Sequence, residues 1–100
     1  MNVISRRGLT RLIDARNLDR ATCEELAAWY RVARAASWMK LSDVQMEFPS
    51  ADQVGQVLVF NIRHNRYRLI TRVGYRTQRL YVKAVLTHKE YDREEWKKWA

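Results

Sequence analysis

The spacing of apolar residues changes once along this chain, at Pro49. Before the proline, apolar residues recur every three to four positions, which is the period of an amphipathic helix. The helices that this spacing predicts are one that ends near Arg16, one that begins at the capping-box pair Thr22 and Glu25, and one from Ser42 to Phe48. A short strand, Asn2–Ser5, is expected before them.

After Pro49 the period shortens to two, which is the period of a strand with one buried face. The strands that this pattern predicts are Val57–Ile62, Arg66–Val73 and Gln78–Leu86, joined by turns at His64–Asn65 and Gly74–Thr77. We therefore expect an α+β fold in which two to three N-terminal helices pack on one face of a small antiparallel sheet. The length and the 47% hydrophobic content suit one core, so residues 1–100 should form a single domain.

The alternation in the last two strands divides their side chains between two faces. In the last strand, the apolar set Leu80, Val82, Ala84 and Leu86 alternates with Arg79, Tyr81, Lys83, Val85 and Thr87. The helices are expected to cover the apolar set and to leave the basic and aromatic set exposed. A four-residue loop between the strands predicts a register in which Arg68 lies opposite Lys83. In the same register Arg72 lies opposite Arg79.

The positive charge of the molecule is concentrated in one segment. Between Gln53 and Lys89 there is no acidic residue, and the rest of the chain balances 11 acidic with 11 basic residues, so this segment carries the whole formal charge of +8. Its basic residues are Arg63, Arg66, Arg68, Arg72, Arg76, Arg79, Lys83 and Lys89. Like charges on facing strands are mildly destabilising and a bound polyanion reverses that effect, so the pattern favours nucleic-acid binding. The alternative is that these side chains spread into solvent, where salt screens their repulsion.

The groups best suited to acid–base chemistry follow the last strand, in the run Thr87–Asp92. This run supplies the imidazole of His88, the phenol of Tyr91 and two carboxylates beside the basic strands. Such groups can move protons on a bound phosphodiester. The alternative is that His88 is an ordinary polar residue at a strand end.

Several classes of protein have no support in this sequence. The single cysteine, Cys23, excludes an intramolecular disulfide and a multi-cysteine zinc site. No nucleophile elbow, phosphate-binding glycine loop or metal-ligand spacing is present, so we expect neither a cofactor nor a metal. No apolar run approaches the roughly 18 residues of a membrane span, and charges interrupt the stretch after Arg6 and Arg7, so we expect a cytoplasmic protein without membrane contact.

Several short motifs occur in the same order as in a known family. They are Trp29-Tyr30, Trp38, Phe48–Asp52, Val59–Ile62, the run Asn65-x-Tyr67-Arg68-Leu69-Ile70, and Thr87-His88-x-Glu90-Tyr91-Asp92. In these motifs the chain resembles the HigB-type toxins of the RelE/ParE superfamily. The resemblance implies a RelE-like toxin of a type II toxin–antitoxin system. It further implies an mRNA interferase that cuts the message on the ribosome, and a HigA-like helix-turn-helix antitoxin that neutralises it.

The chemistry that the resemblance implies uses no metal, because the 2′-hydroxyl of the message attacks the adjacent phosphate. Arg68 and Lys83 are then the candidates for holding the crowded phosphorane. His88 and Tyr91 are the candidates for proton transfer. The candidates for binding the rest of the RNA are Arg63, Arg66, Arg72, Arg76, Arg79, Tyr81 and Lys89.

The chain departs from the family in two places. His64 stands where the family usually has glycine before the asparagine of the first turn, which predicts either a wider turn or a left-handed Asn65. The stretch Asp92–Ala100 follows no family pattern. It is expected to form a short helix, capped by its first residue, that docks Trp96 and Trp99 onto the core.

Two other functions fit the same features. A ParE-like toxin with this fold acts on DNA gyrase and has no use for the proton-transfer residues, so it would stall DNA replication and leave messages intact. A basic RNA-binding module without toxicity uses only the positive strands. Its expression would not arrest growth.

Overall fold

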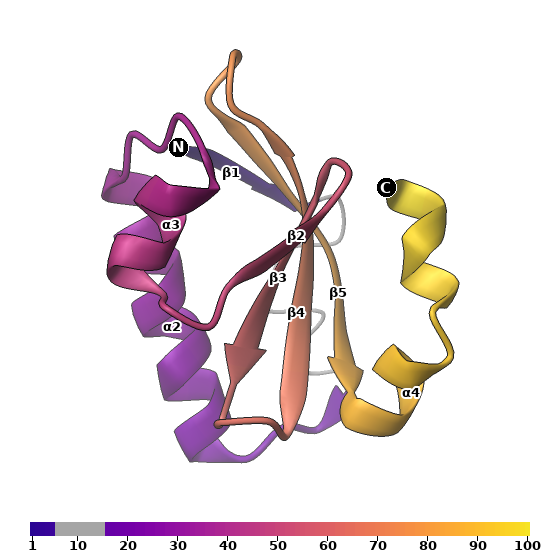
Figure 1. Cartoon of the computed structure of the whole chain (residues 1–100). Helices are drawn as coiled ribbons and strands as arrows, with labels where there is room; N and C mark the ends of the chain where they lie inside the picture. Colours follow the sequence, from indigo (N-terminus) through magenta and orange to yellow (C-terminus); the bar gives the residue numbers. More distant parts are fainter. Residues whose placement is uncertain (6–15) are drawn as a thin grey trace.

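The computed structural model describes residues 1–5 and 16–100. Its elements in chain order are β1 (Asn2–Ser5), α2 (Arg20–Ala35), α3 (Leu41–Glu47), β2 (Asp52–Val54), β3 (Val57–Ile62), β4 (Tyr67–Gly74), β5 (Arg79–Thr87), α4 (His88–Asp92) and a 3-10 helix, η1 (Glu95–Trp99) (Figure 1). The first predicted helix, expected to end near Arg16, lies almost wholly outside these residues. Within the described ranges, no helix has the length and apolar character needed to cross a membrane.

In the described part of the chain, the strands form one five-stranded sheet in the order β1-β5-β4-β3-β2. Neighbouring strands are antiparallel, except that β1 runs parallel to β5 at one edge. The predicted α+β class is confirmed, but the sheet is mixed and includes a strand that was not expected. That strand, β2, is three residues long and begins with two polar residues, so it has too little alternation to be recognised in the sequence.

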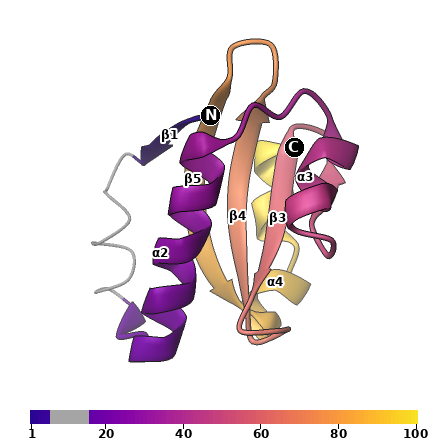
Figure 2. The same cartoon turned by 90° about the vertical axis from the view of Figure 1, so that its left-hand side faces the viewer.

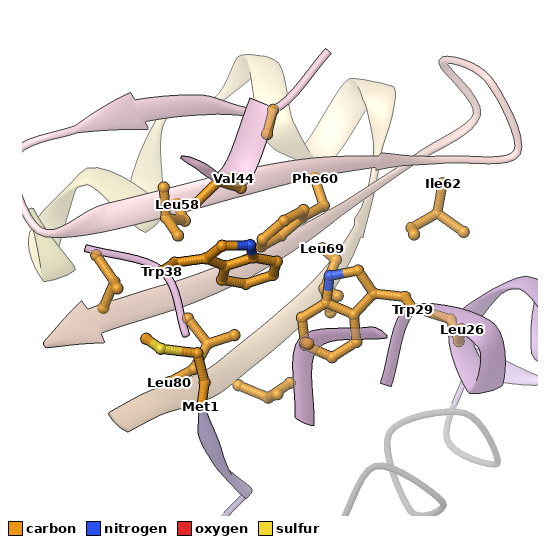
Figure 3. Close-up of a cluster of buried hydrophobic side chains, with 14 of the residues drawn as sticks. Met1, Leu26, Trp29, Trp38, Val44, Leu58, Phe60, Ile62, Leu69 and Leu80 are labelled. Carbon is orange, nitrogen blue, oxygen red and sulfur yellow. The ribbon is translucent and has the colours of Figure 1, made fainter. Parts of the chain in front are cut away.

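The sheet lies between two helical layers (Figures 1 and 2). α2 and α3 cover one face, while α4 and η1 lie on the opposite side. The side of α2 that faces the sheet carries Leu26, Trp29 and Ala33, which recur at helical spacing and are buried. Figure 3 shows Trp29, Trp38 and Phe60 within this helix-side core. The Phe60 ring centroid lies 5.3 Å from that of Trp29 and 6.1 Å from that of Trp38, so aromatic contacts join β3 to the helical layer.

α2 begins at Arg20, two residues before the predicted capping box. The hydroxyl of Thr22 donates to the carboxylate of Asp19. The carboxylate of Glu25 accepts the backbone N–H of Arg63, in the β3–β4 turn. The predicted capping box is therefore wrong, because Glu25 binds a distant turn instead of the start of its own helix.

The β3–β4 turn spans four residues, from Arg63 to Arg66. Arg63 and His64 have φ values of 54° and 60°, whereas Asn65 is not among the residues with positive φ. The wider turn is therefore confirmed, and the left-handed Asn65 is wrong. The strand bounds follow the predictions closely: β3 agrees, and β4 and β5 each begin and end one residue later than predicted.

The predicted register between β4 and β5 is wrong. Arg68 pairs with Leu86 instead of Lys83, and Arg72 pairs with Tyr81 instead of Arg79. Two features cause the difference: the connecting turn lies one residue later than expected, and a β-bulge interrupts the ladder in the middle of β4. The basic residues of the two strands are therefore not directly opposite one another.

The bulge leaves Lys83 unpaired in the ladder and exchanges the faces of the residues that follow it. Val85 joins the helix-side core, whereas Ala84 and Leu86 pack on the opposite face. The alternation predicted along the whole of β5 is thus wrong beyond Val82.

A second, smaller core lies on the sheet face away from α2 and α3. There Trp96 of η1 is buried with Val57, Val59 and Ile70, and Trp99 packs at the edge of this cluster. The expected docking of the two C-terminal tryptophans is confirmed.

The start of the C-terminal helical region differs from its prediction. α4 begins directly after β5 with a capping box, in which the hydroxyl of Thr87 accepts the backbone N–H of Glu90. In return, the carboxylate of Glu90 accepts the backbone N–H of Thr87 at 3.0 Å. Asp92 therefore ends α4 and does not cap the helix that carries the tryptophans.

Candidate active site

The basic residues of β4 and β5 lie on the sheet face opposite α2 and α3, which we call the basic face. In β4, Arg68 and Arg72 alternate with residues of the helix-side core and so point to the other side. In β5, Tyr81 pairs with Arg72, and the Lys83 ammonium lies 5.8 Å from the centroid of the Tyr81 ring. Arg79 alternates with a buried leucine and lies at the far end of the same face.

The basic face is not open along its whole length, contrary to the expectation from the sequence. Trp96 is only 3% exposed and packs on Ile70, which stands between Arg68 and Arg72 in β4. The C-terminal segment therefore divides the basic face into two groups. One group contains Arg72, Tyr81 and Lys83, and the other contains Arg68 with the α4 residues His88 and Tyr91.

Arg68 and Tyr91 are in direct contact. The guanidinium carbon of Arg68 lies 5.2 Å from the centroid of the Tyr91 ring, within the range of a cation–π interaction. Burial of the phenol raises the pKa of Tyr91, the negative charge of Asp52 raises it further, and Arg68 opposes both effects. Tyr91 therefore keeps its proton at neutral pH, where it can donate a hydrogen bond or a proton.

His88 begins α4 and lies on the same side of this helix as Tyr91, three residues later. The Nε2 atom of His88 lies 3.5 Å from a carboxylate oxygen of Asp92, and both side chains are more than half exposed. A carboxylate beside an imidazole can orient the ring by accepting a hydrogen bond from it. α4 thus presents a proton-transfer group next to Tyr91.

Two sets of contacts made by Glu90 fix α4 in place. Its carboxylate accepts the backbone N–H of Thr87 at 3.0 Å, and it forms a two-point ion pair with Arg16, whose Nη2 lies 2.9 Å from Oε2. The hydrogen bonds from Arg16, followed by the one from the Thr87 backbone, lower the pKa of Glu90 to about 2. α4 is therefore tied both to β5 and to the segment that precedes α2.

Lys83 does not share a position with Arg68, although both were predicted to hold the same phosphate. The bulge places Lys83 in the middle of β5 beside Tyr81, whereas Arg68 pairs with Leu86 near the end of β5. The two basic residues therefore belong to different groups of the basic face.

The remaining basic residues are in turns, at the start of a strand or on α4. Arg63 and Arg66 occupy the β3–β4 turn, where they add to the lowering of the pKa of Asp19 that is caused mainly by the hydrogen bond from Thr22. The others are Arg76 in the β4–β5 turn, Arg79 at the start of β5 and Lys89, which is exposed on α4. The structure thus gathers only part of the predicted RNA-binding set on one surface.

Two polar residues beside the Arg68–Tyr91 pair were not among the predicted site residues. Asn61 of β3 pairs with Arg68, and the charge of Asp52 in β2 acts on Tyr91. Asn61 could have been recognised in the sequence, since it is the only polar residue in its strand. Asp52 could not have been recognised, because its position near Tyr91 depends on β2, the short strand that the apolar pattern does not reveal.

The chemistry of this site rests on three kinds of group: the guanidinium of Arg68, the phenol of Tyr91 and the imidazole of His88. A guanidinium can bind two oxygens of one phosphate, and the other two groups can donate or accept protons beside it. Over residues 1–5 and 16–100, no cluster of three or more His, Cys, Asp or Glu side chains is arranged to hold a metal ion. The arrangement suits a phosphodiester substrate.

Comparison with known proteins identifies the family. Residues 22–94 match the family described as HigB toxin, the RelE-like toxic component of a toxin–antitoxin system. The chain belongs to the HigB toxin family. The matched part of this HigB-family toxin includes Arg68, His88 and Tyr91 and ends just before η1. The resemblance inferred from the sequence motifs is thereby confirmed.

Curated relatives of this HigB-family toxin agree with the family match. The chain is 32% identical over 71 residues, 68% of each chain, to the mRNA interferase toxin HigB of Escherichia coli strain K12. The same figures apply to the mRNA interferases HigB of Escherichia coli O157:H7 and Shigella flexneri. As the toxic component of a toxin–antitoxin system, the protein has a cognate antitoxin as its partner.

Proposed function

We propose that this HigB-family toxin is an mRNA interferase that cuts messages at the group formed by Arg68, His88 and Tyr91. The observation that carries the proposal is the contact of Arg68 with Tyr91, 5.2 Å from guanidinium carbon to ring centroid. The exposed His88 lies three residues before Tyr91 on the same short helix. The names of the curated relatives support the same activity. A cation, a proton donor and a proton-transfer group are what cleavage of a phosphodiester requires.

The proposed reaction uses the 2′-hydroxyl of the message as nucleophile. His88 accepts the 2′-hydroxyl proton as the oxygen bonds to the adjacent phosphorus, and Arg68 binds the phosphorane through two oxygens. The bond from phosphorus to the 5′-oxygen then breaks, and the leaving oxygen takes a proton from Tyr91. The products are a 2′,3′-cyclic phosphate and a 5′-hydroxyl. The phenol of Tyr91 is protonated at neutral pH, because its pKa is not below the ordinary value for tyrosine, so it has a proton to donate.

Lys83 has a different part in this proposal from the one predicted from the sequence. Because the bulge places it beside Tyr81, we assign Lys83 and Arg72 to a neighbouring phosphate of the message. Tyr81 can stack on a base next to that phosphate. Such contacts hold the RNA in register while the reaction takes place at Arg68.

The proposal extends to the partners of the toxin. We propose that the substrate is mRNA on the ribosome, that the antitoxin is a HigA-like helix-turn-helix protein, and that both are met in the cytoplasm. Exposed basic side chains such as Arg72 can bind the phosphate groups of an mRNA that is held in place. An antitoxin that covered the same side chains would block the site directly.

The test is induced expression followed by mapping of the 5′ ends of cellular messages. Wild-type toxin should produce cuts within translated frames, and His88→Ala or Arg68→Ala should lower cleavage by at least about 100-fold, because each removes a group that acts on the reacting atoms. Arg31→Ala, on the exposed side of α2, is the matched control and should cut as wild type does. Growth arrest with stalled DNA replication and intact messages would contradict the proposal and favour a ParE-like toxin.

A further inference from the structure

Tyr91 is held by a residue that lies outside the family match. The match ends at Glu94, and Trp96 follows in η1. The rings of Tyr91 and Trp96 are stacked, with centroids 5.0 Å apart and planes inclined by 5°. The indole N–H of Trp96 also donates to the backbone carbonyl of Tyr91 at 2.9 Å. One side chain therefore fixes both the ring and the backbone of Tyr91.

Trp96 is itself buried in the second core. Its indole is 3% exposed and packs with Val57 and Val59 of β3 and with Ile70 of β4. The turn before β3 leaves room for the segment that carries it: Gly55 has a φ of +58°, and a Cβ at this position would lie 3.2 Å from Ala100. A side chain held by two strands of the sheet is a rigid support for a neighbouring ring.

We propose that Trp96 is a positioning residue of the active site, which holds the Tyr91 ring against Arg68 so that phenol and guanidinium reach the same phosphate. The inference rests on the proposed function, in which Tyr91 and Arg68 act on the reacting atoms. An exposed tyrosine has several staggered side-chain orientations, whereas the stack on Trp96 favours one of them for Tyr91 and the hydrogen bond holds its backbone. Because a displacement of about 1 Å can lower a rate by about 100-fold, the loss of this support should reduce turnover.

The competing interpretation is that Trp96 only fills the second core. The matched pair Trp96→Leu and Trp99→Leu separates the two, because both tryptophans belong to η1 and pack on the same cluster, and only Trp96 stacks on Tyr91 in the part of the chain that the structure describes. Trp96→Leu should lower kcat by about 10- to 100-fold with little change in KM. Trp99→Leu should stay within about threefold of wild type. Trp96→Phe keeps a flat ring for the stack and should recover most of the lost kcat.

A second measurement, by NMR, reports on the environment of the Tyr91 ring and does not depend on RNA cleavage. In protein labelled on its tyrosine rings, the Tyr91 resonances should be shifted by the ring current of Trp96. This shift should disappear in Trp96→Leu and persist, reduced, in Trp96→Phe. Wild-type kcat in Trp96→Leu, or Tyr91 resonances that do not respond to either change, would overturn the inference.

The two proposals can fail separately. If the wild-type toxin cuts no message but its Tyr91 resonances depend on Trp96, the proposed function fails and the support of Tyr91 stands as a structural fact only. If Trp96→Leu does not fold, the kcat and the Tyr91 resonances of Trp96→Phe test whether Trp96 supports Tyr91. A Phe variant that loses the ring-current shift completely and keeps wild-type kcat shows that turnover does not depend on this support.

Discussion

Glu90 links three parts of the molecule through a single carboxylate. By accepting the N–H of Thr87 at the end of β5 it completes the capping box of α4, and it also pairs with Arg16 before α2. His88 and Tyr91 stand on either side of it in the sequence. The charge of Glu90 therefore affects both the stability of the fold and the position of the helix that carries the proposed proton-transfer groups.

This charge makes the stability of the toxin depend on pH. The pKa of Glu90 is lowered to about 2 in the folded protein, from 4.5 in an unperturbed glutamate, so its contribution is fully present above the higher value and is lost as the pH falls towards the lower one. Solvent screens the partly exposed pair, so Glu90→Gln should lower the free energy of unfolding at pH 7 by about 1 kcal/mol.

Urea denaturation of both proteins at pH 7 and near pH 2.5 checks this expectation. The difference between wild type and Glu90→Gln should shrink markedly at the lower pH, because wild-type Glu90 is then partly protonated. Glu24→Gln is the matched control, since Glu24 pairs with Arg20 on the exposed surface of α2 and its loss should change little. Equal effects of the two changes would contradict a special role for Glu90.

At the scale of secondary-structure elements, the β-bulge in the β4–β5 ladder decides which side chains reach the basic face. Before the bulge, β5 follows the predicted alternation, with Leu80 and Val82 in the helix-side core. After it, Val85 takes the core position and Ala84 turns to the other face. The bulge also removes Lys83 from the position opposite Arg68.

A pair of substitutions tests this exchange of faces. Val85→Thr places a hydroxyl in the helix-side core with the same shape as valine, so it should lower the free energy of unfolding by about 1 to 2 kcal/mol. Lys83→Thr, on the basic face, should change it by less than about 0.5 kcal/mol. Midpoints of urea denaturation measure both. An uninterrupted strand would place both residues on the exposed face, so Val85→Thr would be almost neutral as well.

The elements themselves were largely predictable from the sequence. Long runs with one clear period, such as Val57–Ile62, gave strands whose bounds agree within one residue. The bulge was not predictable, because Ala84, Val85 and Leu86 are all apolar and fit either face equally well. The candidate site was predictable as a set of residue types, whereas the separation of Lys83 from Arg68 follows from the bulge and is therefore visible only in the structure.

At the scale of the whole molecule, the sheet separates the helical layer from the basic face. The basic face carries Arg68, Arg72 and Lys83, whereas the exposed side of α2 mixes Arg20 and Arg31 with glutamates. The basic residues on the side that we assign to RNA should attract the phosphates of a bound strand. Binding on that side should depend steeply on salt concentration.

This dependence can be measured with a single-stranded RNA that has a 2′-deoxy nucleotide at the cleavage position. The logarithm of the association constant should fall linearly with the logarithm of salt concentration, with a slope of about −0.7 for each phosphate contacted. Arg72→Gln should reduce the steepness by about 0.7, and Arg31→Gln should leave it unchanged. Fluorescence anisotropy measures both slopes, and equal slopes for the two variants would contradict the assignment of Arg72 to RNA.

The parallel pairing of β1 with β5 determines when the fold can be completed. Asn2 lies beside Arg79, so the first strand has to wait for one of the last elements of the chain before it can form its hydrogen bonds. Contacts between such distant residues form slowly, whereas β4 and β5 are joined by a short turn and can pair early. Until β1 docks, β5 is an open edge strand with unpaired N–H and C=O groups. The docking of four residues thus covers this edge of β5 in a newly made toxin.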